Sequence, residues 1–168
     1  GQWLFTNAKI DARSREHVLD SLFGFAERLG VTARSMRWDI PLPDSALAYA
    51  NGAIPDPAKP TLVLSPCSSH ELRNWSVARY AALADHAVQH HGMDVLLCGG
   101  RSPLELDYGA QIEQAMQQPC RNLIGRDTLL EFLATLQRAT VLVSPDSGPA
   151  HMATTVGTPV IGLYAPTN

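Results

Sequence analysis

Residues 141–164 read VLVSPDSGPAHMATTVGTPVIGLY, and the order of residue types in this segment indicates the architecture. An apolar run at 141–143 is followed by a loop, a helix of small residues around 152–156, a turn at Gly157 and a second apolar run at 160–164. This order predicts a βαβ unit. The loop after the first strand of such a unit opens at the carboxyl edge of a sheet, where α/β proteins place ligands.

That loop, residues 144–151, carries groups typical of a binding site. Pro149 suits the first position of a helix and Gly148 the cap before it, so the first backbone N–H groups of the helix can bind an anion. Asp146 only accepts hydrogen bonds, which favours sugar hydroxyls over phosphate as its partners. His151 falls in the first helical turn, within reach of the same ligand. An alternative stays open, in which Asp146 caps the helix and His151 packs locally.

The chain before this unit alternates between strand and helix patterns. Apolar runs and helical periodicity predict strands at 61–64, 94–98 and 122–124, and helices at 76–91, 104–116 and 129–138. We therefore expect an α/β fold, a Rossmann-like parallel sheet with helices on both faces. A helix at 14–30 and a short strand at 35–40 precede it. The proline-rich stretch 43–60, with a short helix around 45–50, is the predicted linker.

Four loops follow strands at one edge of this predicted sheet, at 65–70, 99–103, 144–148 and 165–168. They should surround one crevice, because neighbouring parallel strands bring such loops together. The polar residues that would face it are Ser68, Ser69, Arg73, Glu105, Asp146, Ser147 and Gly148. Arg73 can grip phosphate with paired donors and Glu105 can accept from ribose hydroxyls. Equally, Arg73 could be a solvated surface group and Glu105 a partner of the helix dipole.

Composition and missing motifs exclude several classes of protein. The formal net charge is −3 with no basic stripe, which excludes a nucleic-acid binder, and no apolar run is long enough to span a membrane. The three cysteines form no metal-binding pattern and are expected to be reduced thiols. GxGxxG, GxxxxGK[ST] and GxSxG motifs are absent, as is an Asp-x-Asp pair for a metal-bound diphosphate. We expect no metal and no other cofactor.

The motif DSGPAHMA at 146–153, followed by GTPV at 157–160 and LYAPTN at 163–168, resembles the signature of the family-9 glycosyltransferases. Upstream, the Arg73-Asn74-Trp75 element and the LCGG sequence at 97–100 agree with it. The resemblance is strong over residues 60–168 and loose over 15–40. It implies a GT-B glycosyltransferase, in which two Rossmann-like domains enclose a cleft and the second domain binds the nucleotide-sugar donor.

Carried over by position, the resemblance implies that Ser68 and Ser69 lie near the diphosphate and that Arg73 contacts phosphate or sugar. Glu105 would bind the ribose, and residues 125–127, ending at Asp127, would line the adenine pocket chiefly through backbone. The binding motif itself supplies a set of four residues, Asp146, Ser147, Gly148 and His151. The implied reaction is inverting transfer of heptose from ADP-heptose to a lipopolysaccharide core acceptor, a lipid-linked saccharide.

The same resemblance implies an incomplete enzyme. Residues 1–42 would be the remnant of the acceptor domain, 43–60 the linker and 61–168 the donor domain without its closing helix. The start of the chain has neither an initiator Met nor the features of a signal peptide. The family's general base is expected outside this chain. The resemblance implies a cytoplasmic protein and leaves open a peripheral contact with the inner membrane. Two alternatives stay open, a nucleotide-binding module without catalysis and a GT-B nucleotide-sugar epimerase.

Overall fold

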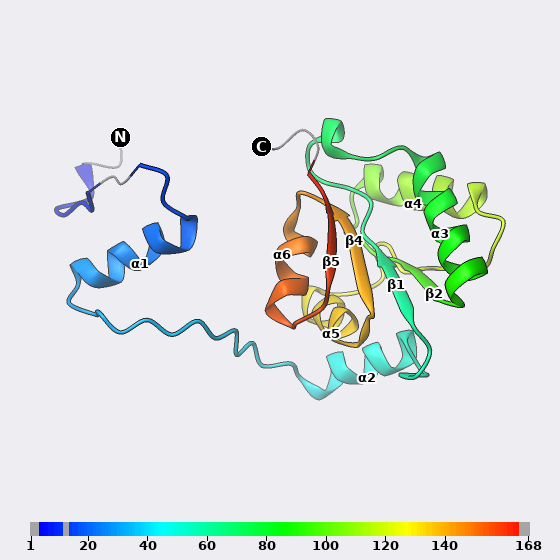
Figure 1. Ribbon diagram of the computed structural model, residues 1–168, viewed down its shortest axis with the longest axis horizontal. Coiled ribbons are helices and arrows are strands. Elements are labelled where there is room, and N and C mark those ends of the chain that lie inside the picture. Colours follow the sequence, from blue (N-terminus) through cyan, green and yellow to red (C-terminus); the bar gives the residue numbers. More distant parts are fainter. Residues whose placement is uncertain (1–3, 12–13, 165–168) are drawn as a thin grey trace. The chain divides into compact units, whose positions relative to one another are not determined.

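The computed structural model of the chain describes residues 4–11 and 14–164 (Figure 1). These residues form two compact units, 1–39 and 40–168. The smaller unit contains helix α1 (Val18–Arg28). The Arg34 guanidinium holds the segment after this helix by donating to Asp20 at 2.8 Å and to Glu27 at 2.7 Å. The helix predicted at 14–30 is confirmed. The strand predicted at 35–40 is wrong, since these residues pair with no strand in the described part of the chain.

The larger unit is built on a five-stranded parallel sheet in the order β3-β2-β1-β4-β5. The strands are β1 (Thr61–Leu64), β2 (Asp94–Leu97), β3 (Arg121–Asn122), β4 (Val141–Pro145) and β5 (Val160–Leu163). The first strand in the sequence is therefore the central strand of the sheet. The predicted α/β class and parallel sheet are confirmed, and each strand lies within two residues of its predicted position.

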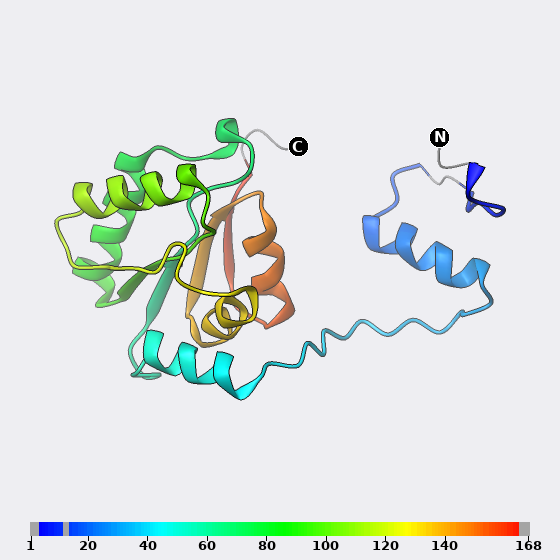
Figure 2. The ribbon, with the colours of Figure 1, turned by 180° about the vertical axis from the view of Figure 1, so that it is seen from behind.

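Helices cover both faces of this sheet (Figures 1 and 2). One face carries α3 (Val77–His91) and α4 (Pro103–Ala115), which contact each other and the strands β1, β2 and β3. The other carries α5 (Leu129–Arg138) and α6 (Gly148–Thr155), with α2 (Asp44–Ala53) packed on α5. A short 3₁₀ helix, η2 (Glu71–Arg73), interrupts the connection from β1 to α3.

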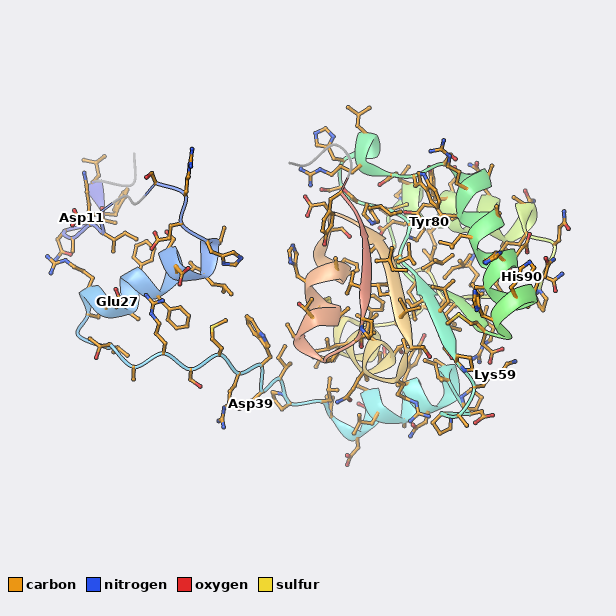
Figure 3. All side chains as sticks on the ribbon, in the orientation of Figure 1. Asp11, Glu27, Asp39, Lys59, Tyr80 and His90 are labelled. Atoms are coloured by element: carbon orange, nitrogen blue, oxygen red, sulfur yellow. The ribbon has the colours of Figure 1, made fainter. Side chains whose placement is uncertain are left out.

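Side chains of the central strand alternate between the two faces, as the two-residue period of a strand requires. Leu62 and Leu64 join the core under α3 and α4, in which Tyr80 is fully buried (Figure 3). Val63 joins the core under α5 and α6, together with Phe132 of α5. Every residue of β1 is buried, because helices lie over both faces, and this explains its unbroken apolar run.

Residues 43–60 differ from the linker that the prolines predict. The boundary between the compact units falls at Asp39–Ile40, and α2 belongs to the larger unit. Ala46 and Ala50 of α2 are buried against α5, since small side chains let the two helices approach closely. The guanidiniums of Arg121 and Arg138 donate to backbone carbonyls at the end of α2. The short helix predicted at 45–50 is thus real, but it is a packed element of the sheet unit.

Candidate functional site

A cleft of about 870 Å³ opens where the loops after β1, β2, β3 and β4 meet. This is the carboxyl edge of the parallel sheet, the place that the βαβ pattern predicts for a ligand. The structure brings all nine predicted site residues to its wall: Ser68, Ser69, Arg73, Glu105, Asp127, Asp146, Ser147, Gly148 and His151. Their roles toward a ligand stay predictions. The fourth predicted loop, 165–168, lies outside the described residues.

An ion pair joins the loops after β1 and β4. The guanidinium of Arg73 lies 3.4 Å from the Asp146 carboxylate and donates to the Asp146 backbone carbonyl at 3.5 Å. About a third of each side chain is exposed, so water screens the pair and it stabilises the fold little. What the ion pair does is fix the position of the Arg73 guanidinium, which it holds beside the loop that leads into α6.

The start of α6 is free of side-chain caps. The N-cap is Ser147. Its hydroxyl bonds to the Ser144 hydroxyl at 2.9 Å and donates to the Pro145 carbonyl, and it accepts no hydrogen bond from the N–H groups of the helix. The prediction that Gly148 is the cap is wrong by one residue, because the extended backbone of Ser147 places Gly148 inside the first turn. Asp146 does not cap the helix either. The backbone donors and positive dipole end of α6 thus meet the cleft beside Arg73, an arrangement that attracts an anion.

The loop after β1 is held by its own polar groups. The Ser68 backbone N–H donates to Asn74 Oδ1 at 2.7 Å, and the Ser68 hydroxyl accepts from the His70 N–H at 3.1 Å. Ser68 is buried, whereas Ser69 is exposed on the cleft wall. Trp75 packs edge-on against the Tyr80 ring with centroids 5.5 Å apart, so it anchors this loop to α3 and is not among the residues that line the cleft.

Glu105 has a structural task in addition to any role toward a ligand. Its carboxylate accepts from the Gly100 N–H at 2.7 Å and from Ser102, with which it forms the capping box of α4. A side chain at Gly100 would clash with it, since an added Cβ would lie 2.8 Å from Glu105 Oε2. The predicted ribose-binding carboxylate is therefore also the group that fixes the loop after β2.

Asp127 contributes a second carboxyl group to the wall, just before α5. Burial raises its pKa to about 6, and the nearby charge of Glu131 acts in the same direction. Its Oδ2 atom is buried and has no hydrogen-bond partner in the described part of the chain. The cleft thus pairs an anion-attracting end at Arg73 and α6 with a carboxyl group that is unusually easy to protonate.

Comparison with known proteins decides the family. The model of glycosyltransferase family 9 (heptosyltransferase) matches residues 1–168. This chain belongs to glycosyltransferase family 9. The lipopolysaccharide core heptosyltransferase OpsX of Haemophilus influenzae is 38% identical over 165 residues, which are 98% of this chain and 47% of OpsX. A lipopolysaccharide heptosyltransferase 3 of Escherichia coli is 32% identical over 108 residues, 64% of this chain and 32% of that protein.

Solved structures agree on the fold. The family-9 glycosyl transferase of Veillonella parvula superposes with a TM-score of 0.84 at 24% identity, over 96% of this chain and 47% of that one. The E. coli heptosyltransferase WaaC, solved with ADP, superposes with a TM-score of 0.70 at 19% identity, over 98% of this chain and 50% of WaaC. This family-9 chain thus spans about half the length of OpsX and of the proteins in these two structures.

The sequence analysis missed the apolar part of the family-9 cleft. Four side chains near the starts of α4, α5 and α6 line it: Leu104, Leu129, Phe132 and Met152. Leucines in a helical pattern resemble core positions, and Phe132 is indeed part of the core. The available signal was position, because the first turn of a helix that follows a strand of a parallel sheet faces the ligand edge. These side chains make part of the cleft wall apolar.

In residues 4–11 and 14–164, no three His, Cys, Asp or Glu side chains come together as a possible metal site. None of the helices in that part of the chain has the length and apolar character needed to cross a bilayer.

The raised pKa of Asp127 predicts how the free energy of unfolding changes with pH. The folded-state pKa is raised, so the folded chain favours the protonated carboxyl, and its free energy of unfolding should fall as the pH rises from about 4 to about 6. Asp127→Asn removes this loss and should raise the free energy of unfolding at pH 8 by about 1 kcal/mol, a value reduced for water entering the cleft. Urea denaturation at pH 4 and pH 8 measures it. An equal gain at both pH values would show that packing, not charge, is responsible.

Proposed function

We propose that this chain is the donor-binding part of an inverting glycosyltransferase that transfers heptose from ADP-heptose to a saccharide of the lipopolysaccharide core. The observation that carries the proposal is the cleft of a family-9 chain in which Arg73 and the uncapped start of α6 meet. A diphosphate needs such concentrated donors, and the carboxylate of Asp146 next to them suits the hydroxyls of an attached sugar. OpsX, at 38% identity, is named as a heptosyltransferase of the lipopolysaccharide core.

In this proposal each group acts on a different part of the donor. Arg73 and the backbone N–H groups at the start of α6 stabilise the negative charge that grows on the departing diphosphate. Asp146 and His151 orient the sugar, and Ser68 and Ser69 donate to the phosphates. Glu105 accepts from the ribose. A general base from the partner domain of the complete protein deprotonates the acceptor hydroxyl, which attacks the anomeric carbon from the face opposite the diphosphate and inverts it.

The acceptor and its location follow from the same proposal. A lipopolysaccharide core saccharide is carried on lipid, so the complete protein meets it at the cytoplasmic face of the inner membrane. This chain supplies the donor half of that encounter. The proposal therefore places the protein in the cytoplasm, in peripheral contact with the membrane through its acceptor side.

Ligand class is the first test. ADP should stabilise the chain and NAD should not, because the diphosphate of ADP ends freely at Arg73 and α6, whereas that of NAD continues into a second nucleoside. At ten times its dissociation constant, ADP should raise the free energy of unfolding by about 1.4 kcal/mol. Thermal unfolding with ADP, GDP and NAD measures this. Stabilisation by NAD without any by ADP would contradict the proposed donor.

Metal independence is the second test. We expect ADP to bind equally well in EDTA and in magnesium, since the cation Arg73 and the backbone donors of α6 take the place of a bound ion. Titration calorimetry with ADP in the two buffers gives both dissociation constants. A tenfold weaker affinity in EDTA would mean that a divalent ion takes part in binding the diphosphate.

The reaction itself requires the complete protein. Incubation with ADP-heptose and a core acceptor should release ADP and extend the saccharide by one heptose of inverted anomeric configuration, which mass spectrometry and NMR detect. A changed donor sugar in the absence of acceptor would identify an epimerase. Binding of ADP-heptose without any product would identify a binding module.

A further inference from the structure

The starting observation is an unsatisfied buried atom in the cleft wall. Asp127 Oδ2 is buried without a hydrogen-bond partner, although Asp127 lines the cleft. Buried polar atoms in folded proteins nearly always have a partner, because an unpaired one loses its hydration without compensation. A ligand group is the partner that the position of this atom suits best.

The order of the strands separates Asp127 from the anion-attracting start of α6. Asp127 acts electrostatically on the thiol of Cys98, which directly follows β2, whereas Asp146 directly follows β4. Strands β2 and β4 lie on either side of β1, so two strand spacings, roughly 10 Å, separate these points. That is about the span from a diphosphate to the base of the same nucleotide. The apolar side chains of Leu129 and Phe132 also line the cleft from α5, which begins directly after Asp127 and Thr128.

Several charged or titratable groups face Asp127. They are Tyr49 of α2, Cys98 directly after β2, Arg101 in the loop after β2 and Glu131 of α5. Burial is the largest influence and favours the neutral carboxyl, Glu131 adds to it, and Arg101 opposes it. The resulting pKa of about 6 means that a modest interaction with a ligand is enough to hold the proton in place near neutral pH.

We propose that the Asp127 side chain, as a neutral carboxylic acid, recognises the adenine base of the donor. Its O–H donates to adenine N1, and its carbonyl oxygen accepts from the N6 amino group. This assignment rests on the proposed function, since it presumes that a nucleotide occupies the cleft. It adds a side-chain determinant of base specificity to a loop otherwise expected to line the pocket through its backbone.

The protonation state of Asp127 then determines which base fits. A protonated carboxyl has one donor and one acceptor, which matches the acceptor N1 and donor N6 of adenine. An ionised carboxylate has acceptors only, which matches the N1–H and N2–H donors of guanine. A site that requires the proton therefore rejects guanine, because the wrong base leaves buried polar groups unpaired.

Calorimetry with ADP and GDP at pH 5 and pH 8 tests the proposal on three proteins: the wild-type chain, Asp127→Asn and Asp127→Leu. An asparagine amide offers one donor and one acceptor at every pH, so it imitates the protonated acid. The wild type and Asp127→Asn should bind ADP equally at pH 5, and the wild type about tenfold more weakly at pH 8. Asp127→Leu should bind ADP about tenfold more weakly than the wild type at pH 5. The titration of ADP itself affects both proteins and cancels in the ratio of their affinities.

The outcomes separate this inference from the proposed function. If all three proteins bind ADP with one affinity at each pH, the side chain does not recognise the base, while the donor assignment stands. If the wild type binds ADP at neither pH, the donor assignment fails and the inference fails with it. At pH 8 the wild type should bind GDP more strongly than Asp127→Asn does. This result, together with the expected ADP affinities, supports the proposal that ionisation of Asp127 changes the preferred base from adenine to guanine. Circular dichroism of both variants verifies that they are folded.

Discussion

Asp146→Asn should lower the turnover of the complete family-9 protein about a hundredfold while leaving its melting temperature nearly unchanged. The substitution keeps the shape and one acceptor oxygen but removes the charge that orients the donor sugar, and losing one preorganised polar group of this kind costs about this much. ADP affinity should hold or rise slightly. Arg73 loses its carboxylate partner at 3.4 Å and is then free for phosphate. Turnover, melting temperature and ADP affinity are measured on one variant.

Asp107→Asn is the matched control. It makes the same change of charge on α4, where the exposed Asp107 carboxylate accepts from Gln111 and lies outside the cleft. Turnover should stay within a factor of two of the wild type. If instead Asp146→Asn lowers the melting temperature and keeps its turnover, Asp146 is a structural group, and the role proposed for it toward the sugar is wrong.

Leu136→Ala should lower the free energy of unfolding by about 3 kcal/mol. Leu136 of α5 is fully buried in the core that Val63 and Leu142 share below this helix, so truncation leaves a cavity that the surrounding side chains cannot fill. Urea denaturation followed by circular dichroism measures the loss. The slope of the transition should be unchanged, because the same surface is exposed on unfolding.

The same helix supplies the control for this prediction. Leu129→Ala removes the same atoms from a side chain that is 70% exposed, and the free energy of unfolding should change by no more than about 0.5 kcal/mol. Similar losses at the two positions would mean that helix propensity, rather than the buried core, determines the effect of both substitutions.

The sheet could be predicted because each of its strands carries a local signal. β1 and β4 are short apolar runs that end at polar loops, and the Thr128–Glu131 capping box marks the start of α5 in the sequence itself. The error at α6 has the same origin, because Gly148 and Ser147 are both common helix caps and only the backbone angles distinguish them. Prolines at 55–60 predict an interruption, but they cannot show that α2 packs against α5.

The gathering of the predicted site residues could also be foreseen, since the topology of a parallel sheet brings its loops to one edge. Contacts between distant residues could not. Arg73 and Asp146 are 73 positions apart, and nothing local indicates that the cation lies beside this carboxylate. Burial of Asp127 depends on how the chain folds around it, so a sequence pattern identifies the residue but not its raised pKa.

The central position of β1 has a consequence for how the protein is made. Among the five strands of this sheet, β1 leaves the ribosome first, yet it must end in the middle of the sheet. The backbone N–H of its Thr61 donates to the Thr140 side chain, 79 residues later. At roughly 5 to 20 residues per second, the ribosome needs about 4 to 16 s to produce that distant partner. During this interval the apolar run of β1 has no β4 to pair with. The sheet can therefore form only after β4 has been synthesised. Until then β1 is an unpaired apolar segment to which chaperones can bind.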